Sequence, residues 1–209
     1  MSLTSRAKSL GMKTPLRGLI ADARYLKGLG WGRSWKEGAS VDSRGHPVPW
    51  LCYPANTLLA ERVKPGLRVF EWGSGGSTLW WANRGATVVA CENDDTWFRR
   101  VTASAPSGAT IIHRDLGELY IEEPVHHEPF DVVVIDGFDR NACSSVAAKC
   151  LTDRGVIIWD NTDRERYKSG LDGLRAAGFR VLTLSGMAPM VSRPTSTSII
   201  YRDGNVLGL

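Results

Sequence analysis

Short apolar runs rich in valine, isoleucine and aromatic residues recur along the chain from residue 67 to residue 202. Runs of this length and composition, bounded by glycine, proline or polar residues, predict buried β-strands. The predicted strands are Leu67–Trp72, Ala86–Cys91, Ala109–His113, Phe130–Asp136, Arg154–Asn161, Phe179–Leu184 and Ser196–Arg202.

Helix-length segments separate most of these strands. They predict helices over residues 77–84, 94–103, 141–151 and 165–177, and a loop over residues 117–130. Strands joined through helices run parallel, whereas the short link at residues 186–194 leaves the last strand antiparallel. The pattern predicts an α/β fold with a doubly wound, mostly parallel sheet of seven strands between two layers of helices.

The residues before the first strand form a separate region in this interpretation. Apolar residues at helical spacing predict an amphipathic helix from Leu16 to Leu26, which Gly28 and Gly30 end. Glycines and prolines predict a loop over residues 31–49, and a helix follows over residues 55–63. We expect a basic arm with a helix over residues 1–48, and then one globular domain over residues 49–209.

Charge is unevenly distributed along the 209 residues, whose net charge is +4. The first 36 residues carry eight basic side chains and one acid, Asp22. Such an arm can bind nucleic acid, anionic lipid or an acidic substrate, although most basic termini are simply solvated.

The sequence lacks features of membrane and secreted proteins. No apolar run reaches the roughly 18–20 residues that span a bilayer, and the first residues lack the apolar core of a signal peptide. The four cysteines include no C-x-x-C pair and do not demand disulfides in a chain of this length. We expect a reduced, cytoplasmic protein without a membrane partner, and a homo-oligomer remains open.

A glycine-rich turn follows the first predicted strand and opens a helix, as in nucleotide-binding βαβ units. Its sequence is Glu71-Trp72-Gly73-Ser74-Gly75-Gly76. A dinucleotide site would have a third glycine where this chain has Thr78. The pattern E-x-G-x-G-G instead resembles the first motif of the class I S-adenosylmethionine-dependent methyltransferases, and the likeness extends from about residue 49 to residue 201.

The resemblance implies the sheet order 3-2-1-4-5-7-6 and a cofactor site along the carboxyl ends of the strands. It implies that Glu71 lies near the cofactor's cationic ammonium, and that an acid or polar residue after the third strand receives the adenine. The acid Glu92, about 20 residues beyond the glycines, is placed to accept hydrogen bonds from ribose hydroxyls. The expected cofactor-binding residues are Glu71, Gly73, Ser74, Gly75, Ser77, Glu92, Asn93, Asp115, Leu116 and Asp136.

Asp136 and the pair Asp160-Asn161 end two strands that a βαβ unit makes neighbours. Two carboxylates and an amide oxygen are hard ligands suited to Mg²⁺. The arrangement resembles the metal-dependent catechol- and caffeoyl-CoA-type O-methyltransferases, which would make Asp136, Asp160 and Asn161 metal ligands. Those enzymes place a lysine where this chain has Asp139. Without a metal, Asp136 or Asp160 would take the acceptor's proton directly.

The predicted function is methyl transfer from S-adenosylmethionine to an oxygen of a small molecule, with S-adenosylhomocysteine as the product. Asp136 and Asp160 are the predicted catalytic residues, and Trp50, Tyr53 and Asn161 the predicted acceptor contacts. Three alternatives remain: an RNA methyltransferase that uses the basic arm, a nicotinamide-dependent oxidoreductase, and a non-catalytic cofactor-binding protein.

Overall fold

The computed structural model describes residues 15–209, with side chains from residue 18 onward, so the first part of the basic arm lies outside the described residues. One sheet organises the fold, with the strand order β3-β2-β1-β4-β5-β7-β6. Strands β1 to β5 run parallel, and β7 is antiparallel to both β5 and β6. The predicted order and the antiparallel last strand are confirmed. The strands are β1 (Arg68–Trp72), β2 (Thr87–Glu92), β3 (Ala109–His113), β4 (Phe130–Ile135), β5 (Leu151–Asp160), β6 (Arg180–Gly186) and β7 (Thr195–Tyr201).

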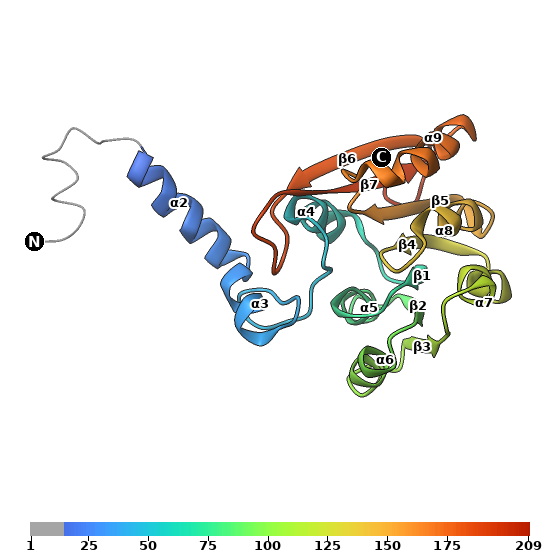
Figure 1. Ribbon diagram of the computed structural model, residues 1–209, viewed down its shortest axis with the longest axis horizontal. Helices are drawn as coiled ribbons and strands as arrows, with labels where there is room; N and C mark the ends of the chain where they lie inside the picture. Colours follow the sequence, from blue (N-terminus) through green and yellow to red (C-terminus); the bar gives the residue numbers. More distant parts are fainter. Residues whose placement is uncertain (1–14) are drawn as a thin grey trace, which may run out of the picture.

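Helices cover both faces of the sheet (Figure 1). One face carries α4 (Tyr53–Arg62), α5 (Gly76–Ala82) and α6 (Asp95–Thr102), and the other carries α7 (Glu118–Glu122), α8 (Arg140–Ala147) and α9 (Lys168–Ala176). Successive strand side chains point to opposite faces, so β4 supplies Val132 and Val134 to one core and Val133 and Ile135 to the other. The predicted three-layer arrangement is confirmed.

Two of the predicted loops contain helices. Residues 31–49 include α3 (Trp31–Glu37), and residues 117–130 include α7 and the 3-10 helix η1 (Glu123–His126). A second 3-10 helix, η2 (Glu165–Tyr167), precedes α9. The helix α3 has glycines in the left-handed conformation at both ends, Gly30 (φ 88°) and Gly38 (φ 59°). Because glycines are typical of loops, the sequence around this short helix indicated a loop.

The segment before α4 packs against the glycine turn. A Cβ atom at Gly76 would lie 2.5 Å from the Val48 carbonyl oxygen and 3.0 Å from that of Ser40, so only glycine permits this approach. The Trp31 indole also donates a hydrogen bond to the Val191 carbonyl oxygen at 2.8 Å. The division at residue 48 stays a prediction, but residues 31–48 are in close contact with the domain.

The predicted amphipathic helix is confirmed as α2 (Pro15–Gly28). It projects away from the sheet and meets the rest of the fold through α3 (Figure 1). Within residues 15–209 no helix is both long and apolar enough to cross a bilayer.

Candidate functional site

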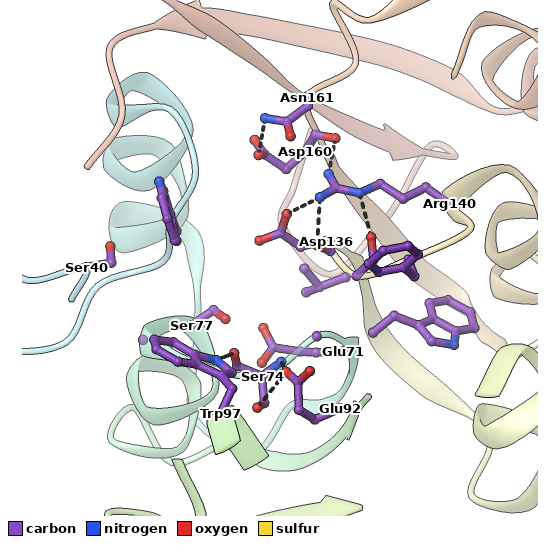
Figure 2. Close-up of a pocket in the computed structure, with 18 of the residues that line it drawn as sticks. Ser40, Glu71, Ser74, Ser77, Glu92, Trp97, Asp136, Arg140, Asp160 and Asn161 are labelled. Atoms are coloured by element: carbon purple, nitrogen blue, oxygen red, sulfur yellow. Dashed lines mark hydrogen bonds and ion pairs between the residues drawn. The ribbon is translucent and has the colours of Figure 1, made fainter. Parts of the chain in front are cut away.

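A cavity of about 540 Å³ lies beyond the carboxyl ends of β1, β2, β4 and β5 (Figure 2). This is where ligands bind in open parallel sheets, because the strand-to-helix turns separate there. Its wall includes most of the residues predicted from the sequence: Trp50, Glu71, Gly73, Ser74, Gly75, Ser77, Glu92, Asn93, Asp136, Asp160 and Asn161.

Glu71 lies at the base of the cavity, and its side chain is almost completely buried. The Thr78 hydroxyl donates to Glu71 Oε2 at 2.6 Å and accepts from the Gly75 amide at 3.0 Å. The other oxygen, Oε1, is buried and has no hydrogen-bond partner of good geometry among the described residues, although the Ser77 and Trp81 side chains lie near the carboxylate. Burial raises the pKa of Glu71 to about 7, against the lowering effect of the Thr78 hydrogen bond. A buried acceptor without a donor suits a cationic ligand group, because such a group would supply the missing hydrogen bond.

The glycine turn is held in shape by the residues around it. Gly73 has φ 91°, a backbone conformation that residues other than glycine rarely adopt. The Trp97 indole donates to the Ser74 carbonyl oxygen and covers Gly75, whose added Cβ would lie 3.6 Å from the ring. The turn thus presents backbone rather than side chains to the cavity.

Glu92 ends β2 and is almost fully buried in the cavity wall. Its Oε2 accepts from the Ser74 amide at 2.9 Å and the Ser74 hydroxyl at 3.1 Å. Its Oε1 accepts from the amides of Asn93 at 2.8 Å and Asp94 at 2.9 Å. The carboxylate therefore joins the glycine turn to the start of α6. The ribose contact predicted for it stays a prediction.

Asp136 follows β4 and points into the cavity, with the Arg140 guanidinium behind it (Figure 2). Its Oδ1 lies 2.8 Å from Arg140 Nη2, and 32% of the side chain is exposed. The other oxygen pairs with no described residue and faces the cavity. Burial raises the pKa of Asp136, and the Arg140 charge opposes that rise.

Asp160 ends β5 and is much less accessible, with 4% exposure. The Thr197 hydroxyl donates to one carboxylate oxygen and the Asn161 amide to the other, both at 2.6 Å. Burial and the neighbouring Asp136 raise the pKa of Asp160 to about 7. Both oxygens are engaged by the protein, so Asp136 rather than Asp160 is free to contact an acceptor.

The side chains predicted as metal ligands do not form a metal site in this arrangement. Asn161 turns its amide nitrogen, not its oxygen, toward Asp160, and Asp136 pairs with the Arg140 guanidinium. Across residues 15–209, no group of three or more His, Cys, Asp or Glu side chains is placed to hold an ion. One Asp136 oxygen is already paired with a cation and both Asp160 oxygens accept hydrogen bonds, so the donor set does not fit Mg²⁺.

Three predicted residues lie away from the cavity wall. Asp115 and Leu116 follow β3 on the surface, because the preceding Arg114 is tied inward by its amide to the Glu92 carbonyl oxygen and by its guanidinium to Glu123. Tyr53 is buried at the start of α4, and its amide donates to the Met187 carbonyl oxygen at 2.7 Å. The adenine and acceptor roles predicted for these residues thus have no support from their positions.

Several cavity residues did not stand out in the sequence. Met190 and Val191 belong to the link that precedes β7, whereas Ser40 and Trp97 belong to a loop and an amphipathic helix without a motif. The Asp136-x-x-x-Arg140 spacing is no helical signal either, because Asp136 follows β4 and α8 begins only at Arg140. The additional lining residues are Ser40, Trp72, Gly76, Asp94, Trp97, Val134, Gly137, Phe138, Arg140, Arg164, Met190 and Val191.

The raised pKa values of Glu71 and Asp160 predict how stability depends on pH. Between the ordinary pKa and about 7, folded Glu71 and Asp160 hold protons that the unfolded chain has released. The free energy of unfolding therefore falls as the pH rises through this range. We expect the melting temperature of the ligand-free protein to fall less steeply in Glu71→Gln, because the amide cannot ionise and can still accept from Thr78.

Thermal melts in buffers spanning this range measure that slope. The exposed Glu122→Gln is the matched control and should retain the wild-type slope. An equal slope in Glu71→Gln and in the wild type would contradict a buried, proton-binding Glu71.

Solved structures with the same fold match this chain at low sequence identity, whereas no family model and no curated protein matches it. An O-methyltransferase from Thermotoga maritima matches with a TM-score of 0.57 and 15% identity, over 74% of this chain and 67% of that chain. A precorrin-6y C5,15-methyltransferase from Geobacter metallireducens has a TM-score of 0.55 and 15% identity, over 71% and 87%. An rRNA methylase from Streptococcus thermophilus has a TM-score of 0.54 and 14% identity, over 72% and 95%. The chain therefore has the seven-stranded fold of the class I S-adenosylmethionine-dependent methyltransferases.

Proposed function

We propose that the protein is an S-adenosylmethionine-dependent methyltransferase that modifies an oxygen of a small-molecule acceptor. One observation carries the proposal. A single cavity brings the glycine turn, the buried unpartnered oxygen of Glu71 and the open oxygen of Asp136 together. The solved structures of similar fold are in accord with methyl transfer, and they differ in the acceptors that their names indicate.

The residues at one end of the cavity fit the cofactor. Glu71 would accept the ammonium group, the turn from Gly73 to Gly75 would pass along the ligand, and Glu92, whose two oxygens already accept four hydrogen bonds, would hold the turn in place. When bound, S-adenosylmethionine supplies a methyl group activated by a positively charged sulfur. The protein's main contribution is to align the acceptor with that methyl group.

The acceptor end is formed by Asp136, Asn161 and the aromatic residues Trp50 and Phe138. Asp136 would take the proton of the acceptor hydroxyl on its open oxygen. Burial raises the pKa of this carboxyl, which increases its strength as a base toward the operating pH. The side chains of Trp50 and Phe138 are both exposed at the cavity and would exclude water by packing on the acceptor.

An RNA acceptor is the alternative that the basic first 36 residues favour. RNA binding through such an arm releases counterions, so the affinity would fall steeply with added salt. A small acceptor held by Trp50 and Asp136 would show little such dependence.

The test has two stages. Calorimetry with S-adenosylhomocysteine should show binding, with NAD⁺ as the control for a nicotinamide enzyme. Transfer of radioactive methyl from S-adenosylmethionine is then measured into a low-molecular-weight metabolite fraction and into total RNA. Label in a small molecule other than S-adenosylmethionine itself supports the proposal, and label in RNA supports the alternative. Absence of S-adenosylhomocysteine binding would refute both, and binding without transfer would indicate a non-catalytic protein.

A further inference from the structure

We propose that the Arg140 guanidinium is a built-in cation that lies between the ends of β4 and β5 and serves there in place of a divalent ion. The inference rests on the proposed function, since it identifies how the acceptor end of that site is held. Arg140 is a positioning residue here: it acts on an acceptor through Asp136.

The guanidinium is bound by oxygen atoms from both strand ends (Figure 2). Nη1 donates to the Asp160 carbonyl oxygen at 2.7 Å and Nη2 to the Asp136 carbonyl oxygen at 2.7 Å. Nε donates to the Gly137 carbonyl oxygen at 3.0 Å, and Nη2 also lies 2.8 Å from Asp136 Oδ1. Three carbonyl oxygens and a carboxylate are the ligand types of a hard metal ion, here satisfied by the fixed donors of one side chain.

The local chain is shaped to put the arginine there. Asp139 takes φ 42° and ψ 49°, a left-handed conformation that a residue with a side chain adopts at some energetic cost. Arg140 is the first residue of α8 and is 8% exposed. Tyr167 covers the guanidinium, with its ring centroid 5.6 Å from Cζ. A cation that is buried this completely requires compensating contacts, and the strand ends provide them.

The positive charge at this position is permanent. Arginine does not release its proton in proteins, so the cation neither dissociates nor depends on metal supply. It opposes the rise in pKa that burial imposes on Asp136 and Asp160. It also fixes Asp136 through one oxygen and leaves the second toward the cavity. An acceptor at this site needs only one hydroxyl, because no ion has to be bridged by a second oxygen.

The substitution Arg140→Ala removes the positive charge of Arg140, and guanidinium ion added to the solution can replace it. This variant should melt about 10 °C below the wild type, because an anion and three carbonyl oxygens lose their donor. Guanidinium chloride at low millimolar concentration should restore part of the loss in a saturable manner, whereas equal sodium chloride should not. Arg166→Ala is the matched control: Arg166 lies over the same Tyr167 ring but is exposed, so neither salt should raise its melting temperature.

A second measurement uses the unaltered protein. Mn²⁺ titration followed by electron paramagnetic resonance should show no tight site in the wild type, and this arm holds even if Arg140→Ala does not fold. Tight Mn²⁺ binding that is lost in Asp136→Asn would overturn the inference, as would a folded Arg140→Ala that guanidinium leaves unchanged. Failure of the proposed function would appear separately, as absence of S-adenosylhomocysteine binding by the wild type.

Discussion

Replacing Asp136 by asparagine is expected to reduce the rate of methyl transfer by about 10²- to 10⁴-fold, the usual contribution of a general base. The open oxygen of this carboxylate faces the cavity, and an amide of the same size cannot accept a proton there. Affinity for S-adenosylhomocysteine should change little, because Glu71, Glu92 and the glycine turn are untouched. Steady-state kinetics on the acceptor found in the transfer screen, together with calorimetry, measure the two effects.

Asp139→Asn is a close control for this experiment. Asp139 lies three residues further along, is exposed and uses its side chain in no cap hydrogen bond. Asparagine also tolerates the left-handed conformation found there, so activity should persist. If Asp136→Asn were active and Asp160→Asn inactive, the base would be Asp160 despite its engaged oxygens.

Replacing Glu92 by glutamine should weaken S-adenosylhomocysteine binding by about 1–3 kcal/mol, although the two side chains have the same shape. Each carboxylate oxygen accepts from two donors, and one of each pair at least is a backbone amide. In either orientation of the amide, the glutamine NH₂ group therefore faces a backbone N–H. Both groups are donors, so no hydrogen bond forms between them. The turn at Ser74 and the start of α6 lose their connection, and the cofactor end of the cavity loses its shape.

Calorimetry on Glu92→Gln measures this loss, and thermal melts show whether the fold survives it. The exposed Glu118→Gln on α7 is a control for the charge change alone. Unchanged affinity in Glu92→Gln would mean that neither the carboxylate charge nor the turn that it holds contributes to the cofactor site.

The sheet was predictable because its strands are the most apolar segments of the chain. Val132 to Ile135 are fully or almost fully buried, as their uninterrupted hydrophobic run indicates for a strand covered on both faces. The short helices were not predictable in the same way. The helix α3 lies between two glycines, and α7 is a single turn, so neither is long enough for a helical repeat to appear.

The site was predictable where chemistry follows directly after a strand. Glu71, Glu92 and Asp136 reach the cavity because the carboxyl ends of parallel strands meet at one edge. Arg140 was not predicted, because its position depends on a carbonyl oxygen of β5, which is distant in sequence. The roles of Asp115 and Leu116 came from a family resemblance, whereas the inward anchoring of Arg114 directs them to the surface.

The contacts between the segment before α4 and the link before β7 have a consequence for synthesis on the ribosome. Trp31 and Tyr53 are translated long before their hydrogen-bond acceptors at Val191 and Met187. Until that link is made, the cavity lacks the part of its wall that Met190 and Val191 form. The acceptor end can therefore close only after the link before β7 has been translated, however early the first helices fold.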